Sequence, residues 1–209
     1  FNFDLIGSLG LYYFDSPEFN PWQIVSYMFM HGSISHIFFN MFALWMFGSQ
    51  IENIWGPKRF LNYYLITGFG AAFIHYLIIH FQISELESFF TENQIQGIVN
   101  SGTFDASSPL FSKARELYSL NHTPVVGASG AVFGLLLAYG MSFPNQIIYL
   151  NFFFPIKAKY FVIIYGLLEF VMGIQNSAGD NVAHFAHIGG MIFGYLIIKY
   201  WKKNDLNFY

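Results

Sequence analysis

A serine and a histidine in two glycine-rich segments have the side chains best suited to chemistry. Ser129 stands in Gly127-Ala128-Ser129-Gly130, where an apolar helix is expected to begin. Unpaired N–H groups and the positive end of the helix dipole can stabilise an oxyanion at such a position. His187, within the sequence AHIGG, can act as a general base because imidazole titrates near neutral pH. A helix-capping serine and a hydrogen-bonded core histidine are the alternative interpretations.

Three further residues could assist such a pair. His36 and Asn40 are four residues apart in an apolar stretch, so they share one face of a helix. Both side chains can donate hydrogen bonds and could complete an oxyanion hole. They could equally form a structural polar pair, since such bonds contribute only ~0.6 kcal/mol on average in membranes. Phe133, one turn after Ser129, could support the imidazole ring, although plain core packing predicts the same residue.

The remaining polar residues of the apolar stretches are expected to have lesser roles. Glu169 lies about twelve residues into a helix that enters from the cytoplasm, which places it near mid-membrane at 1.5 Å per residue. We therefore expect a protonated or hydrogen-bonded structural glutamate rather than a third catalytic residue. His184, one turn before His187, could relay protons or contact the interface, and His31 is expected to brace its loop. Interfacial or loop positions without a role are expected for His75, His80 and His122.

Composition indicates a membrane protein. Of 209 residues, 55% are hydrophobic and only 10% are charged, with a mean hydropathy of +0.43, whereas about a quarter of the residues of soluble domains are charged. The chain has no cysteine, which excludes disulfides and a thiol nucleophile. A net charge of −3 without a dense Lys/Arg run argues against nucleic acid as a partner.

Stretches without Asp, Glu, Lys or Arg predict an all-α membrane bundle, because a spanning helix needs about 20 mostly apolar residues. Residues 1–34 are expected to form an outer interfacial loop and residues 82–124 an outer loop. The Gly56-Pro57 pair should end the first span. The five predicted spans are 35–52, 59–80, 126–143, 157–174 and 182–200.

Glycine spacing predicts that two of these helices pack closely. Gly130 and Gly134 on one, and Gly190 and Gly194 on the other, are four residues apart, a pattern that permits close backbone approach. This packing would bring Ser129 near the histidine.

Basic residues predict the orientation, because short cytoplasmic loops hold an excess of Lys and Arg. Seven fall on one side of the predicted spans and two on the other, which places the C-terminus in the cytoplasm. The seven are Lys58, Arg59, Lys157, Lys159, Lys199, Lys202 and Lys203, and the two are Lys113 and Arg115.

Three motifs in this order resemble the rhomboid family of intramembrane serine proteases. They are His36-Ile-Phe-Phe-Asn40, Gly127-Ala128-Ser129-Gly130 and Ala183-His184-Phe-Ala-His187-Ile-Gly189-Gly190, and residues 52–56 with Arg59-Phe60 are similar to the family's junction after its second helix.

The resemblance implies roles for these residues. Ser129, next to Ala128, would be the nucleophile of a Ser-His dyad with His187 as base and no acidic third member. The side chains of His36 and Asn40, with the backbone N–H of Ser129, would hold the oxyanion, and Phe133 would stack on the catalytic ring. The family's six-helix core implies a first helix before Phe1.

One departure concerns the outer loop. Bacterial members often have Trp-Arg nine and eight residues before the histidine matched by His31, whereas this chain has Trp22-Gln23. Glutamine cannot make the charge-assisted bonds of arginine, so the anchoring of this loop is in question.

The resemblance implies cleavage of transmembrane segments near the outer face of a membrane, most simply the bacterial cytoplasmic membrane, with no cofactor and no metal. A non-catalytic rhomboid-like protein that binds membrane helices is the alternative. A metal or haem site built from His31, His36, His184 and His187 is a further rival, although the chain has no His-Glu-x-x-His motif. Oligomeric state and substrate identity are left open.

Overall fold

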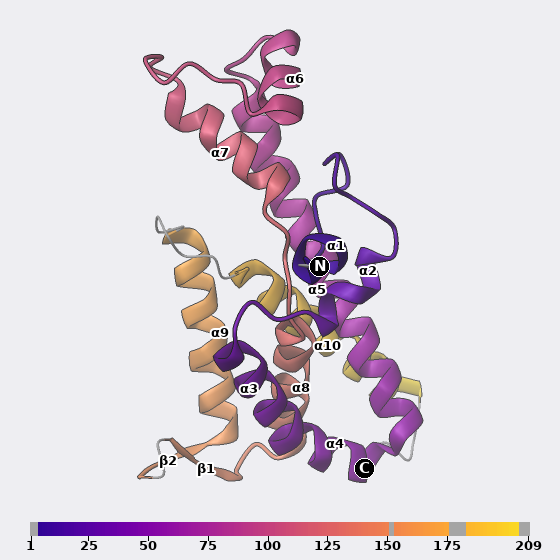
Figure 1. Cartoon of the computed structure of the whole chain (residues 1–209). Helices are drawn as coiled ribbons and strands as arrows, with labels where there is room; N and C mark the ends of the chain where they lie inside the picture. Colours follow the sequence, from indigo (N-terminus) through magenta and orange to yellow (C-terminus); the bar gives the residue numbers. More distant parts are fainter. Residues whose placement is uncertain (1–3, 151–152, 176–182, 205–209) are drawn as a thin grey trace. The chain divides into compact units, whose positions relative to one another are not determined.

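The computed structural model describes residues 4–150, 153–175 and 183–204 (Figure 1). Nearly all of its regular structure is helical, and the predicted all-α membrane bundle is confirmed. Two described helices, α5 (Pro57–Glu87) and α9 (Ala158–Gln175), are long and apolar enough to cross a membrane, and α8 (Ser129–Ser142) is a shorter apolar helix. The last predicted span corresponds to α10 (His184–Asn204).

The first predicted span is a helical path of three pieces. It consists of α3 (Ile34–Ala43), the π-helical turn η2 (Leu44–Gly48) and α4 (Ser49–Trp55). Ser33 caps α3, because its hydroxyl oxygen accepts a hydrogen bond from the backbone N–H of His36 at 3.1 Å. Gly56, with a φ of 76°, ends α4 as predicted, and Pro57 opens α5.

The chain divides into two compact units, each formed from two separate stretches of sequence. The first comprises residues 1–30 and 76–126, and the second comprises residues 31–75 and 127–209.

The first unit contains short helices where the sequence predicted loops. They are α1 (Leu5–Leu9), α2 (Gln23–Ser26), η1 (Tyr27–Phe29), α6 (Glu92–Ser101) and α7 (Phe111–His122). The boundary predicted at His80 is wrong, because α5 continues to Glu87. Its last turns form an apolar stripe of Ile79, Ile83 and Leu86, which is buried in a cluster with Ile98 of α6 and Leu117 of α7. Tertiary packing thus extends the helix beyond its apolar span.

Gln23, at the position where the resemblance to the family led us to expect arginine, anchors the N-terminal segment of the first unit. Its side chain is fully buried. The side-chain oxygen accepts a hydrogen bond from the backbone N–H of Asn20 at 3.0 Å, and Nε2 donates one to the carbonyl of Glu18 at 3.0 Å. A neutral amide therefore holds this segment without the charge of arginine.

The second unit is built around α8. This helix contacts α3, η2, α4, α9 and α10, and its buried residues include Leu135, Ala138 and Tyr139. The surrounding cluster includes Phe47 and Ile51. After α8 the chain forms a hairpin in which β1 (Ile147–Leu150) pairs antiparallel with β2 (Phe154–Lys157). The sequence predicted no strands here, because residues 147–156 belong to an uncharged stretch that shows no clear alternation.

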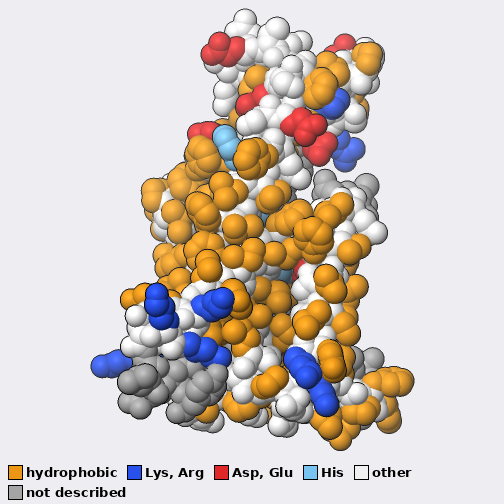
Figure 2. All heavy atoms as spheres, turned by 180° about the vertical axis from the view of Figure 1, so that it is seen from behind, with side chains coloured by type: hydrophobic (Ala, Val, Ile, Leu, Met, Phe, Trp, Pro, Cys, Tyr) orange, Lys and Arg blue, Asp and Glu red, His pale blue; other side chains and the backbone are white. Residues whose placement is uncertain are grey.

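Apolar side chains dominate the exposed surface of the second unit. Figure 2 shows this surface with Lys and Arg side chains gathered at one end. Residues of α3, η2 and α9 contribute to it, including Phe38, Trp45, Ile163 and Leu167, each more than half exposed. Surface of this kind is suited to lipid rather than to water.

Candidate active site

The turn before α8 places Ser129 at the helix start. Gly127 has a φ of 126°, a conformation that residues with a Cβ rarely adopt. A Cβ at this position would also lie 2.9 Å from Cε1 and Nε2 of His36. Ala128 is buried and occupies the N-cap position, and Ser129 is the first residue of α8. The glycine therefore allows both the turn and the approach of the imidazole ring of His36.

Ser129 and His187 are in hydrogen-bond contact. The Oγ atom of Ser129 lies 2.7 Å from Nε2 of His187. His187 is 8% exposed and stacks on Phe133, with ring centroids 4.3 Å apart and planes at 7°. An unprotonated Nε2 at this distance can accept the hydroxyl proton, which is the requirement for a serine nucleophile activated by histidine.

Close packing of α8 on α10 brings the two residues together. A Cβ on Gly190 would overlap the carbonyl group of Gly130. A Cβ on Gly194 would lie 3.5 Å from the Cα of Gly134 and overlap the hydroxyl of Tyr63. The four glycines predicted to mediate helix packing therefore lie where the backbones of α8 and α10 come close to each other.

Residues of α5 fill the other side of the α8 glycines. A Cβ on Gly134 would lie 2.7 Å from the Cβ of Thr67, and a Cβ on Gly130 would overlap that of Ala71. Tyr63 donates a buried hydrogen bond to the carbonyl of Gly134 at 2.7 Å. Two helices, α5 and α10, thus fix the position of the first two turns of α8.

Glu169 is hydrogen-bonded, which is one of the two states expected for it, and its partners are His184 and His187. Its Oε2 atom is 2.7 Å from Nδ1 of His187 and 2.7 Å from Nδ1 of His184. The three side chains are between 7% and 12% exposed. The depth of Glu169 does not keep it from the Ser-His pair, because His187 itself lies one turn inside α10, at a level that Glu169 of α9 reaches.

The sequence did contain a signal for this role of Glu169. It is the one carboxylate in the apolar stretch of residues 160–179. Ionisable residues within membrane spans usually face a partner in the bundle interior.

The ring of His36 adjoins the start of α8, and Asn40 bonds to the backbone of His36. Nδ1 of His36 accepts a hydrogen bond from the backbone N–H of Gly32 at 3.3 Å, so the hydrogen of a neutral ring resides on Nε2, the atom facing Gly127. Asn40 is buried and donates one amide hydrogen to the carbonyl of His36 at 3.0 Å. His31 packs edge-to-face on His36, with ring centroids 5.1 Å apart.

The four histidines considered as metal ligands do not form one site. Among the described residues, the group whose potential ligand atoms lie close together is Glu169, His184 and His187, within 4.8 Å of one another. Their separations of 2.7 Å are hydrogen-bond distances, which two imidazole donors and one carboxylate acceptor explain without an ion.

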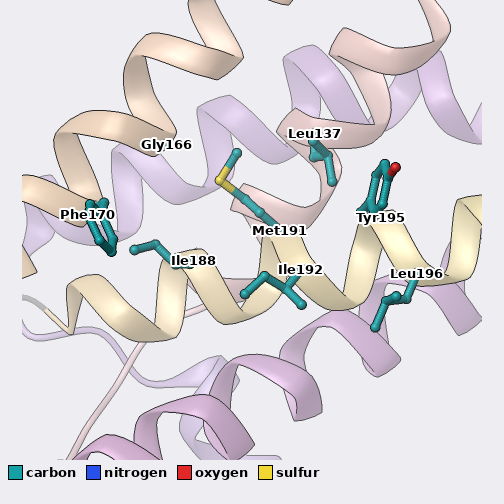
Figure 3. Close-up of a pocket in the computed structure, with 8 residues that line it drawn as sticks. All are labelled: Leu137, Gly166, Phe170, Ile188, Met191, Ile192, Tyr195 and Leu196. Atoms are coloured by element: carbon teal, nitrogen blue, oxygen red, sulfur yellow. The ribbon is translucent and has the colours of Figure 1, made fainter.

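A separate apolar pocket of about 400 Å³ lies between α8, α9 and α10. Figure 3 shows Phe170 of α9 and Ile188 of α10 at one end of it. These residues directly follow Glu169 and His187 in sequence, but the polar residues of the site do not line the pocket. The lining residues are Leu137, Gly166, Phe170, Ile188, Met191, Ile192, Tyr195 and Leu196.

Comparison with known proteins finds similar chains among rhomboid proteins. The rhomboid protease GluP of Bacillus subtilis is 28% identical over 176 residues, covering 83% of this chain and 25% of the relative. The rhomboid protease AarA of Providencia stuartii is 26% identical over 180 residues, covering 84% and 54%. RHOMBOID-like protein 12, mitochondrial, of Arabidopsis thaliana is 29% identical over 170 residues, covering 80% and 42%.

The chain thus spans about half or less of the length of these relatives. The family model described as Rhomboid domain matches residues 18–203. The chain therefore belongs to the rhomboid family of integral membrane proteins.

Proposed function

We propose that this chain is an intramembrane serine protease in which Ser129 is the nucleophile and His187 the general base. The observation that carries the proposal is the 2.7 Å separation of Ser129 Oγ and His187 Nε2 at the start of an apolar helix. Two relatives, GluP and AarA, are named rhomboid proteases. No observation favours the non-catalytic helix-binding alternative over this one.

The proposed reaction has two steps. Ser129 Oγ attacks the peptide carbonyl carbon while its proton passes to His187 Nε2, and the C–N bond then breaks as His187 returns that proton to the leaving amine. Water next attacks the acyl-enzyme, giving its proton to His187 and restoring the Ser129 hydroxyl as the second product leaves.

The developing oxyanion would be held at the start of α8. The backbone N–H of Ser129 belongs to the first helical turn, where N–H groups have no partner within the helix. The Nε2–H of His36 faces the same turn at Gly127. Asn40 has a second amide hydrogen besides the one that it donates to His36. These donors could act together, each removal costing about 10²-fold or more in rate.

The substrate class follows from the setting of this site. A membrane helix has its peptide groups internally bonded, so it must unwind before Ser129 can reach a carbonyl. We therefore propose transmembrane segments with small, helix-weakening residues near the cut. The excess of basic residues on one side predicts a cytoplasmic C-terminus, with the start of α8 toward the outer face. The bacterial cytoplasmic membrane is the proposed location.

Cleavage in vesicles tests the proposal. Purified protein would be reconstituted in phospholipid vesicles with a single-span protein carrying small residues near the outer end of its span. We expect cleavage by the wild type and by Ser142→Ala, a matched control at the far end of α8. We expect none by Ser129→Ala or His187→Ala. Cleavage by folded Ser129→Ala would refute the assignment, and no cleavage by folded wild type would favour a helix-binding function.

A further inference from the structure

We propose that Glu169 is a positioning residue for the proposed dyad, and that His184 in turn holds Glu169. The inference rests on the proposed function and adds to it a hydrogen-bonded series of four side chains, in which the two histidines are buried. The four are Ser129, His187, Glu169 and His184. The resemblance to the family implied a dyad without an acidic member, so Glu169 and His184 would be additions to the expected catalytic residues.

The hydrogen-bond geometry fixes the tautomer of His187. An ionised carboxylate can only accept hydrogen bonds, so Nδ1 of His187, at 2.7 Å from Glu169 Oε2, must donate. In a neutral ring Nε2 then carries no hydrogen. That atom is the one 2.7 Å from Ser129 Oγ, so it is ready to accept the hydroxyl proton.

The second histidine gives the carboxylate another hydrogen-bond partner. His184 Nδ1 lies 2.7 Å from the same Oε2 atom, and its side chain is 7% exposed. A buried carboxylate within a membrane is costly unless it is paired and hydrogen-bonded. Two donors to one oxygen satisfy that requirement and restrict the position of Glu169.

A role in helix packing alone does not account for this arrangement. The buried residues of α9 are Ala158, Phe161 and Val162, all near its beginning, whereas Glu169 contacts α10 further along. If Glu169 served only to join α9 to α10, its hydrogen bond to His184 would be sufficient. The additional bond to His187 ends on the nitrogen opposite the one that faces Ser129.

In the reaction, Glu169 would stay ionised throughout. As His187 takes the Ser129 proton it becomes an imidazolium ion, and the carboxylate stabilises that charge without accepting the Nδ1 proton. His187 later returns the proton at Nε2, so Glu169 neither gains nor loses a proton.

Isosteric replacement of the carboxylate tests the proposal. Glu169→Gln keeps the side-chain shape but can present an amide N–H to Nδ1, which would move the ring hydrogen to Nε2. We expect kcat for cleavage in vesicles to fall about 10³-fold with KM changed less than about threefold. Glu169→Asp, which keeps the charge, should recover part of the loss. The matched control is Glu85→Gln at an exposed carboxylate, for which we expect the wild-type rate.

The kinetic outcomes separate the two proposals. Wild-type cleavage with a Glu169→Gln rate within about threefold of it would overturn the role of Glu169 and leave the proposed function standing. Absence of cleavage by the wild type would count against the proposed function instead. Loss of activity on removal of divalent cations by EDTA would overturn the inference in favour of a metal held by the same side chains.

A measurement on the wild type removes the risk that the variant fails to fold. Nitrogen NMR of protein labelled with ¹⁵N-histidine in detergent micelles, with His187→Ala used for assignment, reports which ring nitrogen is protonated. We expect His187 to be protonated at Nδ1 and not at Nε2. Protonation at Nε2 alone in folded wild-type protein would overturn the inference, whatever its cleavage activity.

Discussion

The helices that carry the proposed site are packed in two different ways. The α8–α10 interface is formed by glycines at backbone-to-backbone distance, and α8 has nine buried residues. Helix α9, of 18 residues, has three, and most of its apolar side chains are exposed. Ser129 and His187 thus lie on a tightly interlocked pair, whereas Glu169 comes from a helix with mostly exposed side chains. Close helix packing would therefore fix the relative position of Ser129 and His187. Polar hydrogen bonds from Glu169 would hold α9 against α10.

The largest expected effect concerns the glycine interface. In Gly190→Ala the new methyl group would overlap the backbone of Gly130, which cannot move without shifting α8. We expect the free energy of unfolding to fall by about 3 kcal/mol, at the upper end of overpacking effects. Denaturation of the purified protein, followed by circular dichroism, measures it.

The matched variant on α9 is Gly166→Ala. Its methyl group would lie 3.1 Å from the terminal carbon of Met191, a flexible side chain that can move. We expect the free energy of unfolding to stay within about 1 kcal/mol of the wild type, since better helix propensity offsets the crowding. Equal destabilisation by Gly166→Ala and Gly190→Ala would contradict the comparison between the two interfaces.

Loss of the ring beneath His187 should have a smaller effect. Aromatic stacking contributes about 0.5–1.5 kcal/mol beyond buried area, so Phe133→Leu should reduce the cleavage rate about fivefold while the protein stays folded. Phe170→Leu on α9, where the ring is 49% exposed, is the control and should cleave at the wild-type rate. Equal losses in both variants would argue against a specific role for the stacked ring.

Tyr63 tests how α5 supports the glycine interface. Tyr63→Phe removes the hydroxyl that donates to the carbonyl of Gly134. A buried hydrogen bond contributes about 1 kcal/mol net to stability. We therefore expect the free energy of unfolding to fall by about 1 kcal/mol, seen as a lower midpoint of chemical denaturation. An unchanged midpoint would indicate that the glycine packing alone positions α8.

The smallest effect is expected on the exposed face of α9. Leu167 is 59% exposed, so Leu167→Ala removes little buried contact. We expect a change below about 0.5 kcal/mol in the free energy of unfolding, measured by the same denaturation. A loss of several kcal/mol would show that this face is covered by protein rather than by lipid.

Local sequence signals predicted much of the arrangement. Uncharged stretches located the spans, and the Gly56-Pro57 pair located the end of the first. Small residues four apart predicted the approach of α8 and α10, and the segments carrying Ser129 and His187 do meet. These signals worked because each depends on residues close together in the chain.

Features that depend on distant contacts were not predicted. The position of Glu169 along its own helix does not reveal which residue of a neighbouring helix it faces. Its hydrogen bond to His187 was therefore not predicted. The final turns of α5 are stabilised by residues of α6 and α7 far along the chain. The side-chain amide of Gln23 bonds to nearby backbone groups, an arrangement that residue type alone does not reveal.

The central claim, that His187 activates Ser129, is tested most directly by labelling with a fluorescent fluorophosphonate in detergent. The wild type and Ser142→Ala should be labelled, and peptide mapping should place the adduct on Ser129. Labelling should be lost in Ser129→Ala and in His187→Ala, with both variants folded by circular dichroism. An adduct on another serine, or labelling of Ser129 that persists in His187→Ala at the wild-type rate, would contradict the account.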